Sequence, residues 1–239
     1  MKLSVVIPAY NEEAIVRDTI RTLSDALCTM CRSAVIDDYE LIFVSDGSSD
    51  RTPQYLREVA DAAPCFRACI YSPNRGKGYA VRTGVLASTG DIVLYTDCDL
   101  AYGTDVIASA VQQLHTTGAD ILIGSRAIHP EGYAGYTPMR RLASVLYLRI
   151  ISIAAGFRHS DSQAGFKAMR GGVGREIFSQ CAIDRFAFDL EMLMRAQKAG
   201  CTITELPVKI VNHRESSIHL IRDSIRMLRD IVRIKKSLK

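Results

Sequence analysis

Short apolar runs alternate with longer segments of helical periodicity along the first half of the chain. The runs that predict strands are Leu3–Ile7, Tyr39–Ser45, Arg67–Tyr71, Asp91–Thr96 and Asp120–Gly124. After the first of them, Val16, Ile20, Leu23 and Leu27 recur at an approximately helical period. Strands that are joined through helices pair in parallel, and both faces of such a sheet are covered. The sequence therefore predicts an α/β fold with a mostly parallel central sheet and helices on both faces.

The second half of the chain is less regular. In chain order, the predicted elements are a loop over 130–138, an apolar helix over 139–156, a strand over 163–169, a turn at Gly171, Gly172 and Gly174, a helix over 186–199 and a strand over 202–211. Proline and glycine mark the loop and the turn, because both residues interrupt regular structure.

The length of 239 residues suits one α/β domain, which we predict over residues 1–217. The apolar stretch at the N-terminus ends at Pro8, so it does not have the pattern of a secretory signal. The longest apolar segment, Ser144–Phe157, contains Arg149 and is shorter than the roughly 18–20 residues of a membrane-spanning helix. We expect a cytoplasmic protein.

Residues 218–239 are predicted to form a basic amphipathic helix, either part of this domain or appended to it. An apolar stripe is formed by Ile221, Ile225, Leu228 and Val232, and a basic stripe follows one residue later at Arg222, Arg226, Arg229 and Arg233. Such a helix suits the surface of an anionic membrane. The alternative is that the apolar stripe packs on the domain. The expected partner is a membrane surface, and no nucleic acid is expected.

Polar residues follow four of the predicted strands. They are Pro8-Ala-Tyr-Asn-Glu-Glu, Ser45-Asp-Gly-Ser-Ser-Asp, Thr96-Asp-Cys-Asp and Gly124-Ser-Arg. Ligands of open parallel sheets bind at the carboxyl ends of the strands. Asp97 and Asp99 are the sharpest feature, because two carboxylates at this spacing can share one Mg²⁺ or Mn²⁺. The alternative is a solvated turn.

A basic, glycine-containing loop, Asn74-Arg-Gly-Lys-Gly, leads into a predicted helix and could cradle a diphosphate. Its glycines could equally be ordinary turn residues. The loop does not have the spacing of a P-loop, and no G-x-G-x-x-G follows the first strand, so a dehydrogenase-type dinucleotide site is not expected.

Four of these motifs together resemble the GT-A glycosyltransferases of family 2. The motifs are Val5-Val-Ile-Pro-Ala-Tyr-Asn-Glu-Glu, Val44-Ser-Asp-Gly-Ser-Ser-Asp, Asn74-Arg-Gly-Lys-Gly and Tyr95-Thr-Asp-Cys-Asp. Later segments, Arg140-Arg-Leu-Ala-Ser, Asp161-Ser-Gln-Ala-Gly-Phe-Lys and Arg185-Phe-Ala-Phe-Asp-Leu-Glu, resemble the branch that glycosylates dolichyl or other polyprenyl phosphates. The resemblance implies a GT-A fold of the nucleotide-diphospho-sugar transferase type.

The resemblance also implies roles for individual residues. It places the nucleotide sugar at Pro8, Tyr10, Glu12, Asp46, Lys77 and Asp97, the Mg²⁺ or Mn²⁺ ion at Asp97 and Asp99, and the acceptor phosphate at Arg126, Arg140, Ser144 and Arg214. The implied catalytic residues are Asp99 and Asp161, the latter being the only candidate for a base. Near Arg214 the family often has a lysine that this chain lacks, which weakens the case for that segment.

The implied reaction is displacement at the anomeric carbon of a nucleotide sugar by the phosphate oxygen of a polyprenyl phosphate, with inversion. A phosphate is already anionic, so it needs no general base. The donor would be UDP-glucose or GDP-mannose, and glucose is favoured because Ala101 stands where mannosyl enzymes often have Gln. The enzyme would act peripherally on the cytoplasmic face of a membrane. Two alternatives are transfer to a soluble or glycan hydroxyl, and a non-catalytic membrane-associated binding subunit.

Overall fold

The computed structural model describes residues 1–157, 159–212 and 220–238, with some side chains of the helices over 138–155 and 220–237 left out of the description. The strands are β1 (Lys2–Ala9), β2 (Asp38–Asp46), β3 (Phe66–Tyr71), β4 (Ile92–Tyr95), β5 (Ile121–Ser125), β6 (Lys167–Arg170) and β7 (Ile203–Pro207). The helices are α1 (Val16–Arg32), α2 (Thr52–Ala62), α3 (Lys77–Ala87), α4 (Asp105–Thr117), α5 (Pro138–Ala155), α6 (Gly171–Gln180), α7 (Phe188–Lys198) and α8 (Leu220–Ser237).

The strands of the described chain form one sheet in the order β3-β2-β1-β4-β6-β5-β7. All neighbouring strands are parallel except β6, which runs antiparallel to both β4 and β5. Lys167 at the start of β6 lies beside Tyr95 at the end of β4. The predicted α/β architecture is confirmed, and β6 begins at the edge where the parallel strands end.

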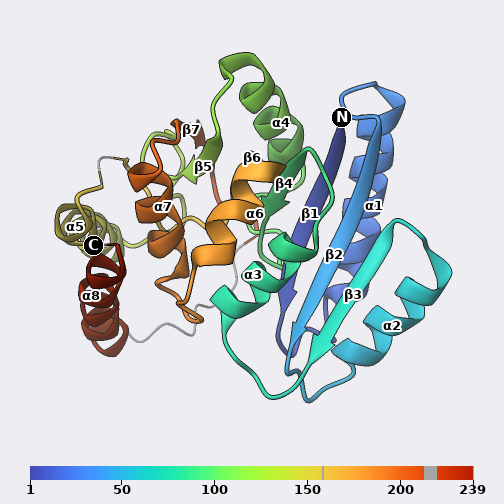
Figure 1. Ribbon diagram of the computed structural model, residues 1–239, viewed down its shortest axis with the longest axis horizontal. Coiled ribbons are helices and arrows are strands. Elements are labelled where there is room, and N and C mark those ends of the chain that lie inside the picture. The colour runs from blue at the N-terminus through green and yellow to red at the C-terminus, as the bar shows by residue number, and fades with distance from the viewer. Residues whose placement is uncertain (158, 213–219, 239) are drawn as a thin grey trace.

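Helices cover both faces of the sheet, because successive residues of the buried strands point to opposite sides. Val5 and Ile7 belong to the core cluster that includes Leu23 of α1. Val6 belongs to the opposite cluster, with Val81 of α3. In Figure 1, α3 and α6 lie in front of the sheet and α1 lies behind it.

The predicted turn at Gly171, Gly172 and Gly174 is wrong, since these glycines form the first turns of α6. Two of them allow close packing. A Cβ atom on Gly171 would lie 2.1 Å from the carbonyl oxygen of Gly90, and one on Gly174 would lie 2.7 Å from the sulfur of Met169. Glycine commonly interrupts regular structure, whereas here it lets a helix approach a neighbouring loop and strand.

Two strands are shorter in the structure than the sequence predicts. The strand predicted over 163–169 begins only at Lys167, and residues 163–166 are not part of a strand. The strand predicted over 202–211 ends at Pro207. Proline cannot donate a ladder hydrogen bond, which favours an end at this residue.

The C-terminal helix forms as predicted, and it packs beside α5 and α7 at one end of the molecule (Figure 1). Ile231 and Ile234 are buried in the same cluster as Phe178 and Phe188. Of the predicted apolar stripe, the structure describes the side chain of Val232, which is 55% exposed. Basic side chains also face solvent, at Arg229, Arg233, Lys235 and Lys236. In the described part of the chain, we find no helix that combines the length and apolar character of a membrane span.

Candidate active site

The carboxylates of the predicted metal pair follow directly from the end of β4. The ammonium of Lys77, the first residue of α3, forms an ion pair with Oδ1 of Asp97. Oδ1 of Asp99 accepts a hydrogen bond from the backbone N–H of Ala101 at 3.1 Å. The amide of Asn212 donates to the carbonyl oxygens of Asp99 and Leu100 at 3.2 and 3.0 Å. Hydrogen bonds and an ion pair thus hold the loop after β4, and the structure brings Lys77 and Asp97 together. Their binding of a nucleotide sugar stays a prediction.

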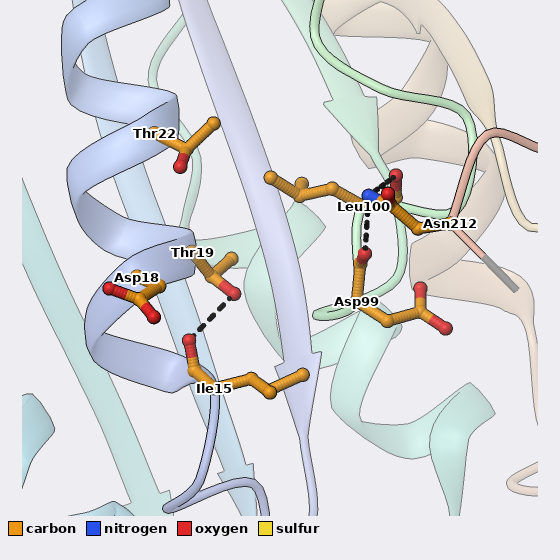
Figure 2. Close-up of a pocket in the computed structure, with 7 residues that line it drawn as sticks. All are labelled: Ile15, Asp18, Thr19, Thr22, Asp99, Leu100 and Asn212. Carbon is orange, nitrogen blue, oxygen red and sulfur yellow. Dashed lines mark hydrogen bonds between the residues drawn. The ribbon is translucent and has the colours of Figure 1, made fainter. Parts of the chain in front are cut away.

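A cavity of about 390 Å³ borders this loop on its α1 side. Its lining residues are Ile15, Asp18, Thr19, Thr22, Asp99, Leu100 and Asn212. Figure 2 shows the carboxylate of Asp99 turned away from the side chains of α1. Neither Lys77 nor Asp97 lines the cavity, so it lies next to the predicted metal pair and not at its centre.

Asp46, at the end of β2, organises the basic loop. Its carboxylate accepts hydrogen bonds from the Tyr71 hydroxyl at 2.9 Å, the Asn74 amide at 2.9 Å, and the backbone N–H groups of Arg75 and Gly76 at 2.8 and 2.9 Å. Asp46 is 3% exposed. Both carboxylate oxygens of Asp46 thus accept hydrogen bonds from within the protein. The expected contact of Asp46 with the nucleotide sugar stays a prediction.

The glycines of the basic loop have a packing reason of their own. Gly76 has a φ of +110°, and a Cβ atom there would lie 2.5 Å from the carbonyl oxygen of Asp184. A Cβ atom on Gly78 would lie 2.5 Å from the Cβ of Phe188. The segment before α7 therefore covers this loop, and no larger residue fits at either position.

The loops after β1 and β2 hold each other. The backbone N–H of Glu12 donates to the hydroxyl of Thr52 at 2.9 Å, and the backbone N–H of Ser49 donates to the side-chain oxygen of Asn11 at 2.8 Å. Pro8 lies within β1, and the side chain of Tyr10 beyond it is 51% exposed. An exposed ring at this edge is available to stack on a planar ligand. The nucleotide-binding roles of Pro8, Tyr10 and Glu12 stay predictions.

Arg126 follows β5 and is held by Asp161. Its Nε and Nη2 atoms donate to the two oxygens of Asp161 at 2.7 and 3.0 Å, and Asp161 has no exposed surface. Burial by itself would lower the pKa of Arg126, but Asp161 outweighs burial and the pKa is raised. In this arrangement Asp161 orients a guanidinium group. Its predicted role as a base stays a prediction.

The segment after Asp161 joins this pair to the metal pair. A Cβ atom on Gly165 would lie 2.3 Å from Oδ2 of Asp97, so the chain runs directly against that carboxylate. Tyr102 is buried near both groups. Burial raises its pKa, while the charges of Arg126, Asp161 and Asp97 all act on it. The two predicted substrate regions are thus neighbours.

Three predicted acceptor residues are not placed. Arg140 and Ser144 lie on α5, but their side chains are outside the description, and Arg214 lies outside the described residues. Arg126 is therefore the acceptor candidate whose side chain the structure positions.

Two buried charged residues beside the site have no role among the residues assigned from the sequence. Lys167 has no exposed surface, and its ammonium lies 2.9 Å from Oδ1 of Asp189. Asp189, on α7, is 5% exposed, so it is not a solvated charge on the outer face of its helix. The available signal was a lysine next to the apolar residues of a predicted strand, because such a lysine needs a buried partner.

The carboxylate pair fits a divalent cation. The described residues contain no group of three or more His, Cys, Asp or Glu side chains that could hold a metal ion. Mg²⁺ needs no such cage, because it commonly takes one or two carboxylates together with waters and substrate phosphates. Asp97 already binds a cation in the form of the Lys77 ammonium.

Comparison with known proteins agrees with this architecture. The family model described as glycosyl transferase family 2 matches residues 4–189. A dolichyl-phosphate beta-glucosyltransferase of Trichomonas vaginalis is 32% identical, with 96% of this chain and 69% of the relative covered. The enzyme of the same name from Saccharomyces cerevisiae is 30% identical, with 98% and 74% covered.

Among solved structures, the glucosyl-3-phosphoglycerate synthase of Mycobacterium tuberculosis has a similar fold. Its complex with Mn²⁺, uridine diphosphate and phosphoglyceric acid superposes with a TM-score of 0.68 at 20% identity, covering 99% of this chain and 78% of that one. The same protein has been solved with Mn²⁺ and UDP-glucose, and with Mg²⁺ and uridine diphosphate. Taken together, the family match and the relatives of about 30% identity along nearly the whole chain show that this protein is a glycosyltransferase of family 2 with a GT-A fold.

Proposed function

We propose that this enzyme is an inverting, metal-dependent hexosyltransferase that moves a hexose from a nucleoside diphosphate sugar to a polyprenyl or dolichyl phosphate. Glucose is the favoured hexose, and mannose is the second candidate. The observation that carries the proposal is the Arg126–Asp161 pair, which fixes a guanidinium on the sheet edge that also carries Asp97 and Lys77. A fixed guanidinium is suited to a phosphate. The curated relatives described above have names that state a dolichyl phosphate acceptor.

On the donor side, Asp97 and Asp99 would hold Mg²⁺ or Mn²⁺, which would neutralise charge on the departing diphosphate. Lys77 adds a positive charge at the same place. Pro8, Tyr10 and Glu12 would border the base. Support comes from the structural neighbour, which has been solved with Mn²⁺ and UDP-glucose.

On the acceptor side, Arg126 would orient the phosphate together with Arg140, Ser144 and Arg214. One phosphate oxygen forms a bond to the anomeric carbon, while the bond from that carbon to the donor diphosphate breaks. The nucleoside diphosphate leaves with the bonding electrons. Because the attacking oxygen is already anionic, the protein's contribution is orientation and charge stabilisation.

The lipid acceptor would be reached from the surface of a membrane. The outer side of α8 carries Val232 together with Arg229 and Arg233, and α5 beside it exposes Ile150 and Ile153. Exposed apolar side chains next to arginines suit an anionic lipid surface, with the apolar groups entering the headgroup region. We propose that this end of the molecule rests on the cytoplasmic face of a membrane.

The direct test offers the purified protein UDP-glucose or GDP-mannose with Mn²⁺ or Mg²⁺ and a polyprenyl phosphate in neutral detergent. Formation of a lipid-linked hexose is the expected result, and the matching polyprenyl alcohol should give none. A soluble acceptor such as 3-phosphoglycerate is run in parallel. Product from that soluble acceptor alone would overturn the lipid assignment. If neither transfer nor hydrolysis of the nucleotide sugar occurs under any condition, a non-catalytic binding subunit would be favoured.

A further inference from the structure

A pair of opposite charges is buried beneath the donor side of the site. The Lys167 ammonium donates to the carbonyl oxygen of Ala164 at 2.7 Å and lies 2.9 Å from Oδ1 of Asp189. The Tyr95 hydroxyl donates to the same oxygen of Asp189. Removing two charges from water costs hydration free energy that their attraction often fails to recover. The presence of the pair is therefore weak evidence that it serves the stability of the fold.

The chain at Asp189 packs against the chain at Lys77. Gly78, the residue after Lys77, packs against Phe188, the residue before Asp189, at a distance that leaves no room for a Cβ atom. Burial would lower the pKa of Lys77, but the charges of Asp97 and Asp189 raise it. Lys77 thus lies in the field of Asp97, Asp189 and Asp99, and in this structure it is paired with Asp97.

A metal ion at Asp97 would compete with Lys77. Both are cations that would bind the same carboxylate, and they would repel each other there, so each would weaken the binding of the other. Once a divalent ion takes both Asp97 and Asp99, Asp189 is the carboxylate of these three whose charge is still available to the ammonium. Lys167 and Tyr95 hold that second carboxylate in place.

We propose that Asp189 is the second counter-ion of Lys77, and that the ammonium moves from Asp97 to Asp189 when a divalent cation binds. Asp189 is then a positioning residue that keeps Lys77 beside the donor diphosphate and lowers the cost of vacating Asp97. This inference rests on the metal site of the proposed function.

The proposal predicts opposite effects of two substitutions on the affinity for Mn²⁺. Lys77→Met removes the competing ammonium, so Mn²⁺ should bind about tenfold more tightly in the absence of nucleotide, the effect of one charge-assisted contact. Asp189→Asn leaves Lys77 with the two proposed metal ligands, Asp97 and Asp99, so Mn²⁺ should bind about tenfold more weakly. In a Lys77→Met background the second substitution should change Mn²⁺ affinity by less than about twofold, since its effect passes through Lys77.

The measurement is a Mn²⁺ titration of the full-length protein, with free Mn²⁺ followed by electron paramagnetic resonance and folding checked by thermal unfolding. Lys209→Met is the matched control, because Lys209 forms a 2.7 Å ion pair with Glu131 outside the metal pair. An unchanged affinity in Lys77→Met, or an equal effect of Asp189→Asn in both backgrounds, would overturn the inference. Wild-type protein that binds no Mn²⁺ would instead overturn the proposed metal site.

A second measurement applies even if Asp189→Asn does not fold. A crystal structure of the wild-type protein with Mn²⁺ should show Nζ of Lys77 within hydrogen-bond distance of the Asp189 carboxylate. An ammonium that stays on Asp97 while Mn²⁺ is bound there would contradict the proposed movement.

Discussion

Asp161 binds the guanidinium of Arg126 through both of its carboxylate oxygens, although no part of Asp161 reaches the surface. A two-point contact fixes the plane of the guanidinium as well as its position. The direction in which Arg126 presents its remaining N–H groups is therefore decided from inside the protein. An arginine held in this way can discriminate between a phosphate and a hydroxyl acceptor by geometry as well as by charge.

Asp161→Asn should raise the KM for the acceptor about tenfold and leave the KM for the nucleotide sugar nearly unchanged, since an amide holds the guanidinium by a weaker, neutral contact. It should also lower the free energy of unfolding by about 3 kcal/mol, because it leaves Arg126 without a charged partner. Steady-state kinetics and urea unfolding test both expectations. Glu131→Gln, which breaks an exposed ion pair, is the control and should cost less than about 1 kcal/mol.

The kinetics also separate orientation from proton transfer. If Asp161 acted as the base, Asp161→Asn would reduce kcat strongly at saturating acceptor and would remove an ionisation from the pH profile of kcat. A normal acceptor KM with a collapsed kcat would therefore contradict the orienting role.

Asp99→Ala should reduce transfer at least about a hundredfold, because it removes one of the two proposed metal ligands. The fold should remain intact, since Asp99 lies in the loop after β4 and not among the fully buried residues. Asp18→Ala is a suitable control, because Asp18 lines the same cavity as Asp99 from α1. Full activity of the wild-type enzyme in excess chelator would contradict the metal assignment.

Substitution of Arg229, Arg233 and Lys236 by Gln should abolish salt-sensitive binding to anionic liposomes, since these residues supply exposed positive charge on α8. The triple substitution leaves Ile231 and Ile234 in the core, so it tests the charge without detaching the helix. Arg17, Arg21 and Arg57 on α1 and α2 provide an equal change of charge elsewhere. Liposome flotation at two salt concentrations is the measurement, and equal loss in both triple variants would contradict a specific role for α8.

The acid side of the stability profile should depend on Glu40. Burial by itself would raise the pKa of Glu40, but hydrogen bonds from Ser4 and Thr89 outweigh it and the pKa lies below its ordinary value of 4.5. A lowered pKa in the folded state means that the carboxylate stabilises the fold above pH 4.5, and that this contribution is lost as the pH falls through the folded-state pKa. Glu40→Gln should therefore flatten the acid limb of a urea-unfolding series between about pH 5 and pH 2. A variant whose stability falls as steeply as that of the wild type would contradict the prediction.

The first half of the fold was predictable because each strand is a short apolar run that ends in polar residues. The same logic placed Asp97 and Asp99 at the carboxyl edge of a parallel sheet, whereas Lys77 was assigned to the nucleotide sugar by family resemblance. It could not place Lys167 or Asp189, because a buried ion pair depends on which strand lies next to which helix. Periodicity does not contain that information.

The errors in the second half have a similar origin. Gly171 and Gly174 interrupt a pattern in the sequence, yet in three dimensions they relieve contacts with Gly90 and Met169. The antiparallel direction of β6 was also not predictable, because its hydrophobic run is short and carries a lysine. The role of these glycines and the direction of β6 both depend on contacts with residues that are distant in the sequence.

The direction of β6 limits how this chain can change in length. The parallel strands end at the substrate edge, so the loops that follow them leave it and could be extended outward. Since β6 begins at that edge, residues 161–165 cross it from the partner of Arg126 to the carboxylate of Asp97. One residue inserted there would shift Asp161, which holds the Arg126 guanidinium, relative to Asp97 and Asp99. The shift would be up to about 3.5 Å, the length of one extended residue. Family members that differ in acceptor should therefore vary freely in the length of the 127–137 loop, while insertions and deletions within residues 161–165 should be selected against.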